Sequence, residues 1–197
     1  MSSTRPKRSS SPDVGVTIER VAEAIDTGPL LRAQRIVHVA LAMGPTLFGA
    51  VVVFLALTQP VPPTPGDEEL VDLLSFVHPL LLVSAVLGGF VVRRLLIRNA
   101  AAKAVDLRSV TAEAFLMGMA QANLIRFSLV EGIALFGLVI CLIAQTSGLL
   151  EGKPEYWANA VTLLVLHGFA VACFPTRQRW LDTAEQALAE ARLRRSE

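Results

Sequence analysis

The sequence has few of the residues on which enzymes and metal proteins usually depend. Its 197 residues include three histidines, two cysteines, one tyrosine and two tryptophans. The histidines show no HxxxH, ExxH or HExxH spacing, so a metal site built on one helix is not indicated. There is also no glycine-rich phosphate loop and no nucleophile grouped with a base. We therefore expect no enzyme, no cofactor and no metal, and we identify no catalytic residue.

The two cysteines, Cys141 and Cys173, both lie inside apolar stretches. The topology predicted below places them near opposite ends of their helices, so we do not expect a disulfide. Their spacing fits no metal site either. We interpret both as small buried hydrophobic residues.

Long stretches of the chain also lack charge. Hydrophobic residues make up 53% of the sequence and the mean hydropathy is +0.53, which is high for a soluble domain. The excess lies in four runs of about the ~20 residues that cross a hydrocarbon core as a helix. A soluble all-helical bundle is disfavoured because its helices should show a polar face. We predict an all-α polytopic membrane protein whose four spans, about 36–57, 73–92, 127–150 and 157–174, form two hairpins.

Basic residues are nearly absent from one side of this predicted topology. Every lysine and arginine except Lys153 precedes the first span, lies between the second and third, or follows the fourth. The positive-inside rule then predicts that both termini and the central loop are cytoplasmic. We expect an integral protein of a plasma or inner membrane.

The segments outside the spans differ in character. Residues 1–13 are polar and basic, and we predict a disordered tail. Residues 14–174 form the predicted membrane domain, in which 16–26 favours a short interfacial helix. Its central loop, about 98–125, favours a surface helix or an extension of the third span. Residues 175–197 favour a C-terminal amphipathic helix at the membrane interface.

Two spans resemble each other. Residues 37–56, VHVALAMGPTLFGAVVVFLA, align with residues 125–144, IRFSLVEGIALFGLVICLIA, around a shared G-x-x-L-F-G core. Both cross the membrane in the same sense, so we predict two hairpins related by a parallel duplication. Small residues on these helices would let their backbones approach closely. The predicted helix-packing residues are Ala40, Gly44, Gly49, Ser128, Gly132 and Gly137.

Glu131 is the one acidic residue in the third apolar run, and Met43 occupies its place in the aligned copy. An ionised carboxylate facing lipid costs a few kcal/mol. Three interpretations remain open. Glu131 pairs with Arg126 or His38 and fixes helix packing, it binds a proton or cation, or it reaches the interface without consequence. His78 and His167 also lie in apolar runs, where a histidine relays protons or, more often, bonds to a neighbouring helix.

The stretch LVEGIALFGLVICLIA, residues 129–144, resembles the carboxylate-bearing helix of the ATP synthase proteolipid (c-subunit) family. In that family a glutamate or aspartate in a small-residue helix binds H⁺ or Na⁺. The resemblance implies that Glu131, at the matching position, is an ion-binding carboxylate. It covers this one helix and implies no enzyme.

These patterns leave two functional hypotheses. The first is a structural or accessory membrane subunit that associates through helix packing. The alternative is an oligomeric protein that handles protons or cations with Glu131. Four spans are few for a self-contained transporter, so the alternative requires oligomerisation. The expected partners are the lipid bilayer and a second copy or another membrane protein, and no nucleic acid is expected.

Overall fold

We describe the fold from a computed structural model, in which residues 15–63, 66–107 and 109–196 are placed well enough to describe. The tail predicted at residues 1–13 lies outside this part of the chain. Within it every regular element is a helix. In chain order these are α1 (Ile18–Thr27), α2 (Leu30–Thr58), α3 (Glu68–Asp106), α4 (Ala112–Thr146), α5 (Leu149–Gly152), the 3-10 helix η1 (Pro154–Ala160), α6 (Val161–Ala172) and α7 (Arg177–Arg195).

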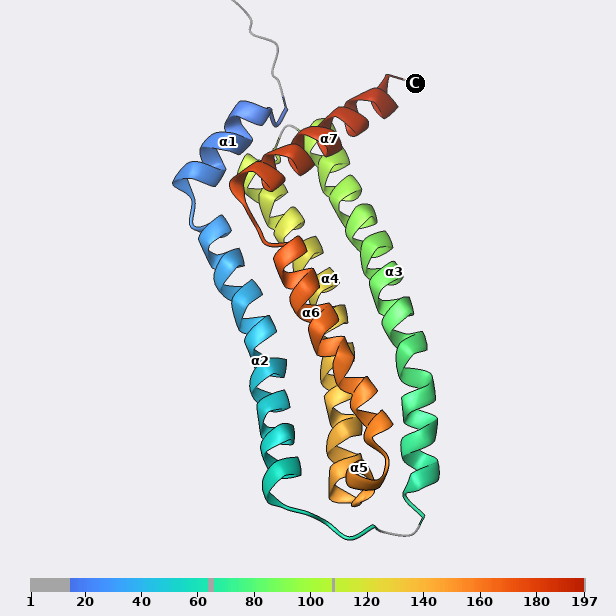
Figure 1. The fold of residues 1–197 in the computed structure, drawn as a ribbon. Helices are drawn as coiled ribbons and strands as arrows, with labels where there is room; N and C mark the ends of the chain where they lie inside the picture. The colour runs from blue at the N-terminus through green and yellow to red at the C-terminus, as the bar shows by residue number, and fades with distance from the viewer. Residues whose placement is uncertain (1–14, 64–65, 108, 197) are drawn as a thin grey trace, which may run out of the picture.

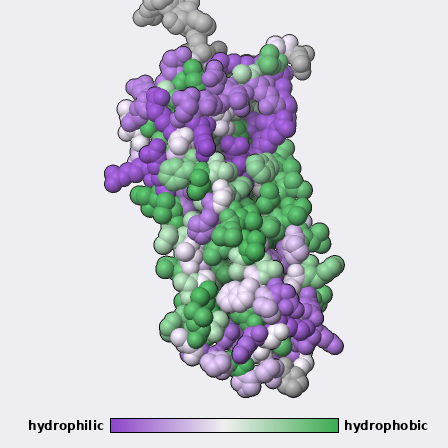
Figure 2. Space-filling view, viewed as in Figure 1, coloured by the Kyte–Doolittle hydropathy of each residue, from purple (hydrophilic) through white to green (hydrophobic). Residues whose placement is uncertain are grey.

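Three of these helices are long and apolar enough to cross a membrane. They are α2, α3 and α4, with 29, 39 and 35 residues. The fourth predicted span falls on Pro154–Ala172, which meets α7 at a bend of 78°. If this bent pair is counted as one span, the structure has four candidate crossings. An all-helical chain with three or four candidate spans is thus confirmed. In Figure 2 apolar side chains cover the middle of the visible face, and hydrophilic ones gather toward its two ends.

Helix α4 is the centre of the bundle. It packs against α2, α3, α6 and η1. Of its most apolar stretch 44% is buried, compared with 17% for α2 and 11% for α3. In Figure 1 α2 and α3 lie on opposite flanks of the pair formed by α4 and α6. The two flanking helices therefore take most of their protein contacts from α4.

Helices α3 and α4 extend well beyond the thickness of a membrane. At a rise of 1.5 Å per residue, α3 is about 58 Å long, nearly twice a hydrocarbon core of about 30 Å. The segment predicted as a central loop, 98–125, is largely helical, because α3 continues to Asp106 and α4 begins at Ala112. The side chain of Thr111 accepts a hydrogen bond from the Ala114 backbone N–H and caps the start of α4.

The extended ends of α3 and α4 are covered by α1 and α7 (Figure 1). We call this the α1–α7 end of the bundle. Apolar residues from all four helices form one buried core there, including Val21, Ile25, Ala101, Phe115, Leu116, Met119, Trp180 and Leu188. The apolar residues of α1 and α7 thus pack against protein in this structure.

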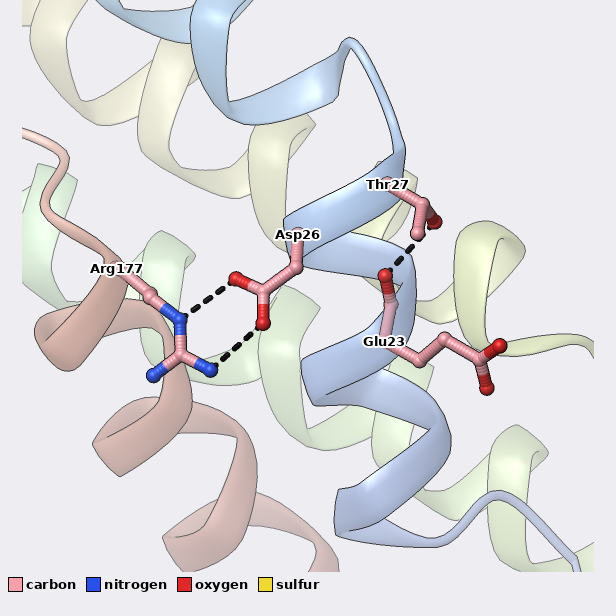
Figure 3. Close-up of polar contacts among 4 residues, drawn as sticks. All are labelled: Glu23, Asp26, Thr27 and Arg177. Carbon is pink, nitrogen blue, oxygen red and sulfur yellow. Dashed lines mark hydrogen bonds and ion pairs between the residues drawn. The ribbon is translucent and has the colours of Figure 1, made fainter.

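An ion pair joins α1 to α7. Arg177 donates from Nε to Asp26 Oδ1 at 2.6 Å and from Nη2 to Asp26 Oδ2 at 2.8 Å (Figure 3). This two-pronged contact favours the charged carboxylate and lowers the pKa of Asp26. Thr27 Oγ1 donates to the Glu23 carbonyl one turn earlier and closes the end of α1.

At the opposite end, which we call the α5 end, the chain turns sharply after α4. The helix ends at Thr146, before the predicted limit at residue 150, and Gly148 adopts a φ of +69°. This left-handed backbone favours glycine. A Cβ at Gly148 would also collide with the carbonyl of Val61, because the loop between α2 and α3 passes over this position.

Candidate functional site

Glu131 lies on α4 at its boundary with α2. Its side chain is half-buried. A Cβ built on Gly44 would lie 3.9 Å from Glu131 Oε1, an ordinary contact distance, so Gly44 of α2 is next to the carboxylate. Among the described residues the Glu131 carboxylate forms no ion pair and no hydrogen bond. It is a carboxylate in apolar surroundings without a cation.

The two predicted partners of Glu131 point elsewhere. Arg126 is buried, and its guanidinium carbon lies 5.1 Å from the ring centre of Phe90 and 4.9 Å from that of Phe169. Both distances are typical of cation–π contacts. Arg126 and Glu131 are five residues apart on one helix, a spacing that places them on different faces.

His38 joins the same aromatic cluster. Its Nε2 donates to the Ala170 carbonyl at 2.9 Å. Its ring centre lies 4.2 Å from that of Phe127 and 5.7 Å from that of Phe174. The structure therefore brings His38 and Arg126 into one cluster near the α1–α7 end and leaves Glu131 outside it.

The six predicted helix-packing residues fall into two groups. Gly49 and Gly137 are buried, whereas the other four are exposed: Ala40, Gly44, Ser128 and Gly132. A Cβ at Gly49 would touch Leu163 and Leu138 at 3.3 and 3.4 Å, so Gly49 lets α2 approach α4 and α6. A Cβ at Gly132 would meet nothing within 4 Å.

Three of the four exposed residues are near Glu131: Ser128 and Gly132 are three residues before it and one after it on α4, and Gly44 approaches it from α2. Ala40 and Gly44 are one turn apart on α2, and Ser128 and Gly132 are one turn apart on α4. Since Gly44 faces Glu131, the two pairs lie on one side of the bundle. We call Ala40, Gly44, Ser128, Glu131 and Gly132 the α2–α4 face. Leu47 and Val51, 62% and 51% exposed, extend its α2 edge toward the α5 end.

A buried polar cluster joins α3, α4 and η1. His78, only 2% exposed, is its centre. The distance from His78 Nδ1 to Asn159 Oδ1 is 2.9 Å, and the distance from His78 Nε2 to the Ile133 carbonyl oxygen is 3.2 Å. These bonds connect three elements through one imidazole.

The orientation of the Asn159 amide shows which of its atoms faces the His78 ring. The Asn159 Nδ2 group donates to the Tyr156 carbonyl at 3.0 Å and to Ser75 Oγ at 2.9 Å. Because a carbonyl only accepts, the amide nitrogen must face Tyr156 and the amide oxygen must face His78. Both imidazole nitrogens therefore face acceptors.

Polar contacts continue from this cluster to the surface at the α5 end. The Tyr156 hydroxyl, on a buried side chain, donates to Asp72 Oδ1 at 2.6 Å, and Asp72 is exposed. Nearby, Lys153 forms an ion pair with Glu68. The cluster thus has a polar boundary on one side and apolar helices on the other.

His167 contacts its own helix, α6, and the neighbouring helix α2. Its Nδ1 donates to the Leu163 carbonyl at 2.7 Å, and its Nε2 lies 3.0 Å from Thr46 Oγ1 on α2. Thr46 Oγ1 has one hydrogen, which it donates to the Ala42 carbonyl at 2.7 Å, so its oxygen meets His167 Nε2 as an acceptor. The bonds of His167 and His78 to neighbouring helices agree with the more common role of membrane histidines.

Metal and disulfide chemistry find no support in the part of the chain that the structure describes. No group of three histidine, cysteine or acidic side chains there could hold a metal ion. Cys141 is buried, Cys173 is half-buried, and both are free.

The sequence predicted the polar cluster only in part. His78 was recognised, but its partners Asn159 and Tyr156 were not. Asn159 interrupts the predicted fourth span and Tyr156 directly precedes that span, and a buried asparagine needs partners. That interruption was the available signal, but it does not show which helix supplies the partner.

Comparisons of the chain with protein-family models, with curated proteins and with solved structures find no match.

We predict that Gly137→Ala destabilises the bundle. Its Cβ would lie 2.5 Å from His78 Cε1 and would collide with the Asn159 carbonyl, so backbone must move. Overpacking of this kind costs about 1–3 kcal/mol. Gly132→Ala is the matched control on the same helix, where a Cβ meets open space. Thermal unfolding in detergent should show a lower midpoint for Gly137→Ala alone, and equal midpoints for the two variants would contradict this packing.

Proposed function

We propose that the chain is a four-span integral membrane protein that serves as a structural or accessory subunit and associates with a second copy through the α2–α4 face. The α1–α7 end, which carries most of the basic residues, would then be cytoplasmic by the positive-inside rule. The protein would reside in a plasma or inner membrane.

The length of η1 and α6 supports the fourth span. The two elements run without interruption from Pro154 to Ala172. At a rise of 2.0 Å for each 3-10 residue and 1.5 Å for each α-helical residue, they cover about 32 Å. This length suffices for a hydrocarbon core of about 30 Å. Cys173 and Pro175 then lie where the chain leaves the membrane and turns into α7.

The exposure of Ala40, Gly44, Ser128 and Gly132 is the observation that carries the proposed association. Small residues four apart let helices approach closely in a membrane, where packing rather than the hydrophobic effect drives association. If these four residues were buried inside the bundle, they would account only for the packing of helices within one chain. On the surface they leave two small-xxx-small pairs without a helix against them.

A second copy of the chain is the occupant that fits this face. Both pairs are of the kind that self-associates, and a two-fold arrangement places the same surface on both sides of the interface. Glu131 would be covered at the centre of such an interface and removed from lipid. The internal repeat points the same way, because α2 and α4 present the same spacing side by side.

We predict that Gly132→Leu weakens association about tenfold, which corresponds to about 1.4 kcal/mol, because a leucine there would hold the facing helices apart. Energy transfer between labelled copies in lipid vesicles, measured as the lipid-to-protein ratio is varied, gives the association constant. Gly168→Leu is the matched control, because Gly168 is also exposed, on α6, and a Cβ there meets nothing within 4 Å.

Equal association of wild type and Gly132→Leu would contradict a role of this face. Loss of energy transfer in Gly168→Leu alone would place the interface on α6. Wild-type chains that remain monomeric at every ratio would favour another membrane protein as the partner.

Among the described residues no basic side chain pairs with Glu131. This observation favours a second function, an oligomer that handles protons or cations through this carboxylate. A Glu131 paired with arginine would have a structural role only. A Glu131 without such a partner can exchange a proton or bind a cation. The local resemblance to the proteolipid helix supports the same function.

For this second function we predict that a hydrophobic carbodiimide labels Glu131. The reagent attacks the protonated carboxyl group, so a rise in pH or competing Na⁺ should suppress the labelling. Glu131→Gln should fold normally and abolish it, and Glu151→Gln, at the exposed α5 end, should leave it unchanged. Peptide mass spectrometry identifies the labelled residue. Labelling of Glu131 that responds to neither pH nor Na⁺ would contradict an ion site.

A further inference from the structure

A cavity of about 260 Å³ lies at the α1–α7 end, away from the α2–α4 face and from the His78 cluster. It lies where residues of α3, α4, the segment between α6 and α7, and the first turns of α7 meet, and it is partly open to the surface. Its polar lining residues include Arg93, Asn123, Arg126, Arg179, Trp180 and Asp182. The cavity thus lies at the transition from the apolar middle of the bundle to its polar end.

The lining of this cavity carries an excess of positive charge. Three guanidinium groups reach it from three helices, and Asp182 is the one carboxylate among the lining residues. Asp182 is exposed and already accepts a hydrogen bond from Gln178 Nε2 at 2.8 Å. Within the described part of the chain, none of the three arginines forms an ion pair with a carboxylate.

Neighbouring groups hold two of these arginines in place. Arg93 Nε donates to Asn123 Oδ1 at 2.7 Å, which uses one of its five N–H groups. Arg179 Nη1 donates to the Ala172 carbonyl at 2.5 Å and to the Phe174 carbonyl at 3.3 Å. Both side chains are oriented at the cavity and retain donors for a further acceptor.

Two buried donors in the lining have no acceptor. Arg126 Nε and Trp180 Nε1 are inaccessible and have no hydrogen-bond partner among the described residues. Arg126 is 8% exposed and Trp180 is 3% exposed. Since buried donors are almost always paired, two orphans beside one cationic cavity indicate that an acceptor is needed there. The aromatic faces of Phe90 and Phe169 attract the charge of Arg126 but accept no conventional hydrogen bond from it.

We propose that this cavity binds a phosphate group, carried by an anionic lipid headgroup or by a soluble phosphate. A guanidinium offers parallel N–H groups that match phosphate oxygens, and three of them supply both charge and orientation. Basic pockets between membrane helices on the cytoplasmic side are suited to anionic headgroups. The phosphate would neutralise Arg93, Arg126 and Arg179 together and hold α7 against α3 and α4.

Trp180 supplies a reporter for binding because its indole lines the cavity. The chain has two tryptophans, and the other, Trp157, packs at the α5 end. In a Trp157→Phe background the emission therefore comes from Trp180. Inorganic phosphate is titrated into the full chain in a zwitterionic detergent. In a second arm the chain is placed in phosphatidylcholine nanodiscs that contain increasing fractions of phosphatidylglycerol.

We expect a saturable change in Trp180 emission in at least one arm. A response to phosphate in detergent indicates a soluble ligand, and a response to phosphatidylglycerol alone indicates a headgroup. Arg126→Gln and Arg179→Gln should each weaken binding at least about tenfold, since each removes charge-assisted hydrogen bonds. Arg179 is exposed, so that variant tests the site even if Arg126→Gln folds poorly.

Arg94→Gln is the matched control. Arg94 is exposed, adjoins Arg93 on α3 and does not line the cavity. Its replacement should leave the affinity unchanged. Equal weakening by Arg94→Gln and Arg179→Gln would show attraction by the general surface charge and would overturn the site. The absence of a saturable change in both arms would overturn it as well.

Discussion

The close approach of backbones at α4 is the constraint on which the rest of the structure depends. Gly137 leaves room for the His78 ring and the Asn159 carbonyl to reach α4. Gly49 similarly brings α2 against leucines of α4 and α6. In a membrane, where lipid is as apolar as the side chains, such contacts replace the hydrophobic effect as the source of helix association. The long helices α2 and α3 would otherwise have little to hold them, because most of their apolar surface remains exposed.

Polar groups are distributed over this bundle in three environments. At the α5 end His78, Asn159 and Tyr156 satisfy one another and reach the surface at Asp72. At the α1–α7 end arginines gather around a cavity with unsatisfied donors. Between them Glu131 lies half-buried on an exposed small-residue face. The first cluster finds its contacts within one chain, whereas the other two contain groups without a partner among the described residues.

The sequence predicted the apolar helices well because lipid imposes both their length and their composition. It could not predict their arrangement, since a helix that is apolar all round does not show which side meets a neighbour. The predicted second span ends at residue 92, and α3 continues past this limit to Asp106. The contact between His78 and Asn159 joins residues 81 positions apart, and no local pattern indicates such a pair. The sequence identified Glu131, Arg126 and His38 as candidates. It could not show that Glu131 lies apart from the other two, because only the fold defines which face of each helix meets a neighbour.

Cross-linking between copies tests most directly the claim that the α2–α4 face remains open in one chain and is covered by another. Ser128→Cys places a thiol on this face, and Ser84→Cys places one at a position on α3 that is also exposed. Both are made in a background where Cys141 and Cys173 are replaced by alanine, and mild oxidation is applied in lipid vesicles. The account predicts rapid disulfide-linked dimers of Ser128→Cys and few of Ser84→Cys. Equal rates for the two variants, or dimers of Ser84→Cys alone, would contradict it.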